Sequence, residues 1–104
     1  MSTFDNVTVD IKANVYFGGN VTSRTITFAS GEVKTLGIMM PGEYTFNTGK
    51  AEIMDITSGN VEYRLADSEE WHAVTGGEKF DVPANSSFDI KVTSTTDYIC
   101  SFIN

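Results

Sequence analysis

Cationic side chains are scarce in this sequence. Seven Lys and Arg stand against 14 Asp and Glu, so the formal net charge at pH 7 is −7. Proteins that bind DNA or RNA neutralise phosphates with a basic surface, and this composition supplies none. We therefore expect no nucleic-acid partner. A single small anion would need a local cationic pocket.

Long apolar runs are also absent. No stretch approaches the roughly 20 residues of a membrane span, and residues 1–5 lack the basic and apolar regions of a secretion signal. Cys100 is the only cysteine, which excludes an intrachain disulfide. We expect no membrane association and a cytoplasmic, reducing location. We expect Cys100 to be a small apolar filler and His72, the only histidine, to lie on the surface.

The remaining composition is that of one folded domain. The 104 residues are 40% apolar and 12% aromatic, which is enough to fill a core. Turn residues recur about every 8–12 residues, with apolar–polar alternation between them, and no segment has a convincing helical period. This pattern predicts an all-β, single-domain barrel or double-sheet jelly roll. Gly37 interrupts one apolar strand, where we expect a bulge or a close backbone approach.

The N-terminal residues are expected to lie outside this domain. Val7, Val9 and Ile11 alternate, so we interpret residues 1–13 as an arm or edge strand and residues 14–104 as the domain. A chain this small should leave open sheet edges that pair between subunits. We therefore expect a homodimer, with residues 7–11 as a candidate contact.

One residue conflicts with the alternating pattern of residues 41–59. Glu52 shares its parity with Met54 and Ile56, so its carboxylate should face the core with them. A buried carboxylate destabilises a fold unless something in its surroundings pairs with it. Glu52 is therefore the first candidate for a functional residue.

Two glycine-framed blocks, residues 42–59 and 77–88, resemble the two motifs of the cupin superfamily. The resemblance implies a cupin-type jelly-roll β-barrel. Metal-binding cupins carry two or three His and one Glu in these motifs, but only Glu52 is present here. Phe46 and Thr48 (or Thr48 and Lys50) stand at the first-motif histidine positions, and Phe88 stands at the second-motif one. A transition metal needs several converging ligands, so we expect no metal site.

A longer series of blocks narrows the resemblance. Residues 14–17, 37–46, 52–54, 58–59, 80–83 and 98–100 together are similar to the pyrimidine/purine nucleoside phosphorylases, a family of small metal-free cupins. This resemblance spans about residues 14–103. It implies a pentosyltransferase of the glycosyltransferase class, which uses phosphate to split nucleosides into free base and pentose 1-phosphate. It further implies broad base specificity, a homodimer, and no cofactor beyond inorganic phosphate as co-substrate.

Phosphorolysis places positive charge on the sugar and negative charge on the leaving base. We expect Glu52 to bind the ribose hydroxyls and favour the sugar cation, and Thr48 to donate to phosphate as the second catalytic residue. The expected substrate-binding residues, for base stacking or phosphate contact, are Tyr16, Thr45, Phe46, Lys50, Phe88 and Tyr98.

Each of these residues has an ordinary structural alternative: a carboxylate satisfied by backbone amides, a strand threonine, a core aromatic or a solvated lysine. Lys50 is the first choice for the phosphate cation, because the motif places it near Thr48, but Arg24, Lys34 and Arg64 remain open. A different class of function also remains open. A non-catalytic, metal-free cupin that binds a small polar metabolite would have the same composition and strand pattern.

Overall fold

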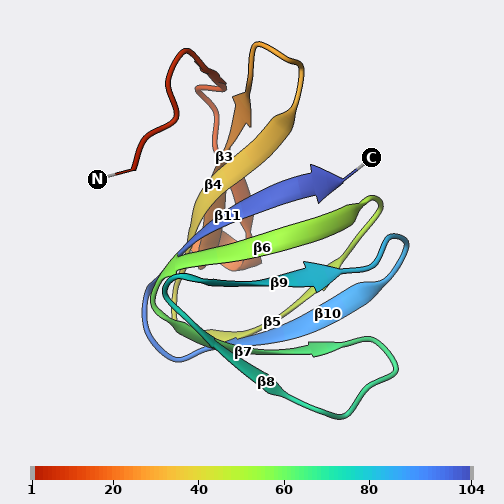
Figure 1. Cartoon of the computed structure of the whole chain (residues 1–104). Helices are drawn as coiled ribbons and strands as arrows, with labels where there is room; N and C mark the ends of the chain where they lie inside the picture. Colours follow the sequence, from red (N-terminus) through yellow and green to blue (C-terminus); the bar gives the residue numbers. More distant parts are fainter. Residues whose placement is uncertain (1, 104) are drawn as a thin grey trace.

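The computed structural model describes residues 2–103, and their regular structure is β apart from one short 3-10 turn, Phe17–Gly19 (Figure 1). The strands follow the turn signals of the sequence closely. They are β1 (Thr8–Val9), β2 (Asn14–Tyr16), β3 (Val21–Thr27), β4 (Val33–Met39), β5 (Gly42–Asn47), β6 (Ala51–Ser58), β7 (Asn60–Leu65), β8 (His72–Thr75), β9 (Glu78–Val82), β10 (Ser87–Val92) and β11 (Thr96–Ile103).

The strands form two antiparallel sheets. The larger sheet has the order β1–β3–β4–β11–β6–β9, with β2 also pairing with β3, and the smaller sheet has the order β5–β10–β7–β8. Figure 1 shows the smaller sheet lying below the β6 and β9 edge of the larger one. This arrangement confirms the predicted all-β class. It joins strands that are distant in sequence, since β11 lies between β4 and β6.

The core lies between the sheets and is built by period-two alternation. In β10, Phe88, Ile90 and Val92 are at most 4% exposed, while the residues between them are only partly buried. The larger sheet contributes Met39, Met54 and other side chains to the same cluster. Burial of this apolar surface is the main force that holds the two sheets together.

The N-terminal segment extends the free edge of β3. Thr8 of β1 pairs with Thr27 of β3, and Asn14 of β2 pairs with Ser23 of β3. Both short strands therefore lie along the same edge of β3. β1 has only two residues, and Ile11 beyond it is 93% exposed. The predicted start of the N-terminal arm at residue 1 and the predicted end of the domain at residue 104 lie outside the described residues. Within residues 2–103, no helix is long and apolar enough to cross a membrane.

Candidate active site

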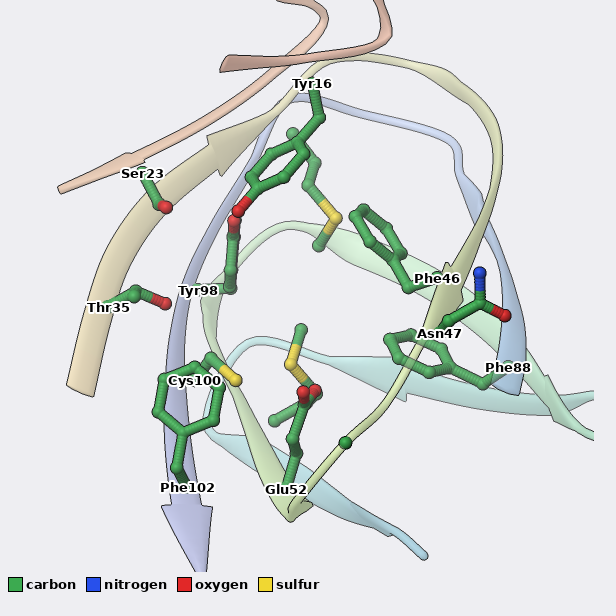
Figure 2. Close-up of a pocket in the computed structure, with 13 residues that line it drawn as sticks. Tyr16, Ser23, Thr35, Phe46, Asn47, Glu52, Phe88, Tyr98, Cys100 and Phe102 are labelled. Atoms are coloured by element: carbon green, nitrogen blue, oxygen red, sulfur yellow. The ribbon is translucent and has the colours of Figure 1, made fainter. Parts of the chain in front are cut away.

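A cavity of about 330 Å³ opens between the larger sheet and the β5–β10 pair. Figure 2 shows its walls, with the two sheets on opposite sides. The volume lies at the small end of the range for small-molecule sites. The titratable or hydroxyl-bearing side chains that line it are Tyr16, Ser23, Thr35, Glu52, Tyr98 and Cys100.

Glu52 provides the carboxylate of this cavity. It stands on β6 with Met54 and Ile56, as its parity predicts, and pairs with Phe102 on β11 and Val82 on β9. Figure 2 shows the carboxylate pointing into the cavity. Burial raises the pKa of Glu52 above its usual value, and a hydrogen bond from Cys100 offsets part of that rise. The apolar surroundings therefore favour the protonated form or a partner that donates to the carboxylate.

Cys100 is a hydrogen-bond donor in this site. It lies on β11 in alternation with Tyr98 and Phe102, and all three line the cavity. Burial and the neighbouring Glu52 raise the pKa of the Cys100 thiol far above its usual value, so the sulfur stays protonated. Thr35 hydrogen-bonds to this sulfur in turn. Cys100 is small and buried as expected, but it also donates to Glu52 and is unsuited to be a nucleophile.

Tyr98 lies flat against the strand beside it because Gly37 has no side chain. Gly37 is its direct cross-strand partner, and a Cβ there would lie 2.6 Å from Tyr98 Cε1. The expected close approach at Gly37 is therefore present. The β11–β6 register also shifts between Asp97 and Tyr98, an irregularity that re-aims side chains near binding sites. Burial raises the pKa of Tyr98 to about 12, so its hydroxyl remains a donor at neutral pH.

Aromatic rings form the opposite wall of the cavity. Phe46 and Phe88 pair directly across β5 and β10 and stack with centroids 5.5 Å apart at 24°. Tyr16 meets Phe46 edge-on at 6.1 Å and is 45% exposed. Phe46 and Phe88, which stand at expected histidine positions of metal-binding cupins, thus present apolar rings to the cavity. Such a wall suits a flat ring that stacks without specific hydrogen bonds.

Five of the eight predicted site residues line this cavity: Glu52, Tyr16, Phe46, Phe88 and Tyr98. The prediction that Thr45 faces the interior was wrong. Thr45 alternates with the inward Tyr44 and Phe46, so it lies exposed on the outer face, where its Oγ1 donates to Asp89 Oδ1 at 2.7 Å.

Thr48 and Lys50 also lie outside the cavity. Thr48 is 8% exposed, and its Oγ1 donates to the Pro83 carbonyl at 2.7 Å and accepts from the Ser86 amide at 3.0 Å. Both contacts join the β5–β6 turn to the β9–β10 turn. Lys50 is exposed and lines a separate groove that shares only Phe102 with the cavity. Among residues 2–103, no Lys or Arg lines the cavity wall.

Replacing Thr48 with valine tests its structural role. We expect Thr48→Val to lower the free energy of unfolding by about 1–3 kcal/mol, because two part-buried hydrogen bonds are lost while the shape is kept. Urea denaturation measures this loss. The matched Thr48→Ser variant keeps the hydroxyl and should stay closer to the parental protein. Equal stability of Thr48→Val and the parental protein would contradict the assigned role.

The sequence interpretation missed several polar residues of the cavity, notably Ser23, Thr35 and Asn47. A signal existed for Ser23, because it lies midway between Val21 and Thr25 in an alternating strand and shares their parity. Small hydroxyl residues are common in strands, so this parity alone did not distinguish them. His72, whose imidazole is a common metal ligand, is exposed on β8, where its ring packs against Tyr63.

Two facing β-sheets around a small cavity give this chain a cupin-type fold. An RmlC-like cupin from Shewanella frigidimarina matches the fold with a TM-score of 0.70 at 16% identity, over 97% of this chain and 86% of that chain. A protein of unknown function from Acinetobacter matches more closely, with a TM-score of 0.95 at 43% identity over 97% and 98% of the two chains.

Sequence comparison specifies the family. The family model for pyrimidine/purine nucleoside phosphorylase matches residues 11–102. The pyrimidine/purine nucleoside phosphorylase of Geobacter sulfurreducens is 61% identical over 99% of both chains, and that of Geotalea uraniireducens is 59% identical over 100% of both. This chain belongs to the pyrimidine/purine nucleoside phosphorylase family.

Proposed function

We propose that this protein is a nucleoside phosphorylase with broad base specificity. It cleaves purine and pyrimidine nucleosides with inorganic phosphate and releases free base and pentose 1-phosphate. The observation that carries the proposal is near-60% identity along the whole chain to relatives named pyrimidine/purine nucleoside phosphorylase. The reaction class is pentosyl transfer, and phosphate is its co-substrate with no resident cofactor.

The reaction balances without a covalent enzyme intermediate. A phosphate oxygen forms a bond to C1′ as the C1′–N bond breaks, and the electron pair of that bond goes to the base nitrogen. The proton of hydrogen phosphate ends on the released base. The protein has to hold phosphate and nucleoside in line and to stabilise the charge that develops on the sugar.

The cavity provides distinct surfaces for these tasks. Glu52 lies between the Tyr98 side of the cavity and the Phe46–Phe88 pair in Figure 2. We assign the base to the aromatic wall and the ribose hydroxyls to the Glu52 carboxylate, which also favours the sugar cation electrostatically. Stacking on Phe46 and Phe88 uses the face of the ring rather than its edge, which accounts for loose base specificity.

A phosphate-dependence assay tests the function. Purified protein incubated with uridine or inosine should release uracil or hypoxanthine together with ribose 1-phosphate, and release should stop when phosphate is omitted. Chromatography of the bases measures both. Binding of the nucleosides without release would indicate a non-catalytic cupin that binds small metabolites. Release that is independent of phosphate would indicate a hydrolase.

The assembly and location proposed here follow from surface and thiol chemistry. Val9 and Ile11 are exposed next to the short edge strand β1, so we propose a homodimer that covers this edge. Sedimentation of the parental protein and of Ile11→Lys tests it: the parental protein should be a dimer and the variant a monomer. A parental monomer would contradict the proposal. The free Cys100 thiol fits a cytoplasmic location.

A further inference from the structure

Two chain connections cross from one sheet to the other beside the cavity. Residues 48–50, the first crossing, join β5 of the smaller sheet to β6 of the larger sheet. Residues 83–86, the second crossing, join β9 of the larger sheet to β10 of the smaller sheet. Gly49 of the first crossing lines the cavity, and Figure 2 shows this crossing between the labelled residues Asn47 and Glu52.

The two crossings begin and end at paired residues. On the smaller sheet Asn47 opposes Ser87, and on the larger sheet Glu52 opposes Val82. The crossings therefore run side by side from one sheet to the other. Because both are short and both link the sheets, the path that they take limits how far apart the sheets lie at this end of the cavity.

Thr48 joins the two crossings through both its backbone and its side chain. Its amide donates to the Ser86 carbonyl at 2.8 Å, and its Oγ1 accepts from the Ser86 amide at 3.0 Å. The same Oγ1 donates to the Pro83 carbonyl at 2.7 Å. A further backbone bond runs from the Asn85 amide to the Gly49 carbonyl at 2.9 Å.

The Thr48 hydroxyl holds both ends of the second crossing at once. Pro83 directly follows Val82 on the larger sheet, and Ser86 directly precedes Ser87 on the smaller sheet. One oxygen atom, on a residue that is only 8% exposed, therefore fixes the path of the second crossing between the sheets. Loss of this hydroxyl leaves the two backbone bonds between the crossings but frees the ends of the second crossing.

The same crossings carry two facing parts of the cavity wall. Phe46 lies two residues before Thr48, and Phe88 lies two residues after Ser86, so both rings stand next to the smaller-sheet ends of the crossings. Glu52 stands next to their larger-sheet ends. A change in the path of a crossing therefore moves the Glu52 carboxylate relative to the aromatic pair. In enzymes, a misplacement of about 1 Å can lower the rate about 100-fold.

We propose that Thr48 is a positioning residue, whose hydroxyl fixes the distance between the Glu52 carboxylate and the Phe46–Phe88 pair by tying the two crossings together. This inference rests on the proposed phosphorylase function, in which the ribose lies on Glu52 and the base lies on the aromatic pair. Thr48 does not line the cavity, so it acts on the nucleoside only through these two walls. Its effect falls on the alignment of C1′ for the chemical step.

Steady-state kinetics of Thr48 variants test the proposal. Thr48→Val keeps the shape and removes both hydroxyl hydrogen bonds, so kcat for uridine should fall about tenfold, while the KM for uridine and for phosphate each change less than about threefold. Thr48→Ser keeps the hydroxyl and should retain kcat within about twofold of the parental value. Circular dichroism selects conditions in which each variant is fully folded, so that a loss of folded protein does not lower kcat.

Thr93→Val is the matched control at the opposite ends of β6 and β10. Thr93 follows β10, and its Oγ1 donates to the carbonyl of Asn60, the first residue of β7, at 3.1 Å. This hydroxyl also joins two segments that link the sheets, but neither Thr93 nor Asn60 lines the cavity. Thr93→Val should therefore retain the parental kcat.

Three kinetic outcomes would overturn the proposal. The first is a parental kcat in folded Thr48→Val, and the second is a tenfold loss in Thr48→Ser or in the Thr93→Val control. The third is a rise in the phosphate KM with unchanged kcat, which would make Thr48 a phosphate ligand. If Thr48→Val does not fold, Thr48→Cys decides, because its thiol is a weaker hydrogen-bonding group and kcat should lie between the serine variant and a tenfold loss.

Failure of the phosphorylase function itself is a separate outcome. If the parental protein releases no base from any nucleoside, crystal structures of the parental protein and of Thr48→Val still test the positioning role. The separation of the Glu52 carboxylate from the Phe88 ring should differ by more than about 0.5 Å, which is the tolerance of a preorganised site. An unchanged separation would overturn the proposal whatever the protein catalyses.

Discussion

Replacing Glu52 with glutamine should lower the turnover of uridine phosphorolysis by about 100-fold or more. Glutamine keeps the shape and a hydrogen bond to ribose, but it removes the negative charge that favours the sugar cation. Preorganised electrostatic groups of this kind typically contribute two to three orders of magnitude in rate. Glu62→Gln on β7, which does not line the cavity, is the matched control and should retain parental turnover. Parental turnover in Glu52→Gln would remove Glu52 from the mechanism.

The same substitution should make the protein more stable at neutral pH. Burial raises the pKa of Glu52 above 4.5 in the folded protein, so folding favours the protonated side chain. Stability from this group is fully present below the unfolded pKa and is lost as pH rises through the folded pKa. Glutamine resembles the protonated form at every pH. The melting temperature of Glu52→Gln should therefore match the parental value near pH 4 and exceed it near pH 8.

A variant that loses activity and gains stability is typical of a residue kept for function at a structural cost. Thermal unfolding across pH, followed by circular dichroism, measures this difference. A Glu52→Gln protein that is less stable than the parent at pH 8 would show that the carboxylate is fully satisfied within the fold. In that case Glu52 would be structural rather than catalytic.

Gly37→Ala should strongly destabilise the fold, because the added methyl group has no space on β4. The added Cβ would lie 2.3 Å from the Thr22 carbonyl oxygen and 2.7 Å from Tyr98 Cζ, and the first of these is backbone that cannot rotate away. Overpacking of this kind costs about 1–3 kcal/mol or more. We expect a loss of about 3 kcal/mol, which would lower the melting temperature by roughly 10–20 °C in a domain of this size.

Urea denaturation measures the change, with Gly49→Ala as control because a Cβ there meets nothing within 4 Å. Stability equal to that of Gly49→Ala would contradict the close approach described for Gly37.

Much of the fold could be predicted from the sequence because strand signals are local. Turn residues bound each segment, and alternation alone placed Glu52 with Met54 and Phe88 with Ile90 on inward faces. The same rule should have placed Thr45 outside, since it lies between two inward aromatic residues. Thr45 was assigned to the site because its hydroxyl could donate to phosphate, although side chains on a strand alternate between the two faces.

What the sequence could not provide is the set of partners across strands. Thr48 has the right parity for the cavity, but its hydroxyl is used by Pro83 and Ser86 from another turn. Ser23 meets Tyr98, and Cys100 meets Glu52, in the cavity from distant parts of the chain. Such contacts depend on which strands pair and in what register, and no local pattern encodes that choice.

The sequence by itself therefore determined the all-β class, the succession of strands along the chain, the family resemblance and an inward carboxylate at Glu52. Only the tertiary structure decided which hydroxyls line the cavity together. The physical reason is that side-chain parity repeats every two residues along one strand, whereas the cross-strand row of Asn14, Ser23, Gly37 and Tyr98 spans four strands.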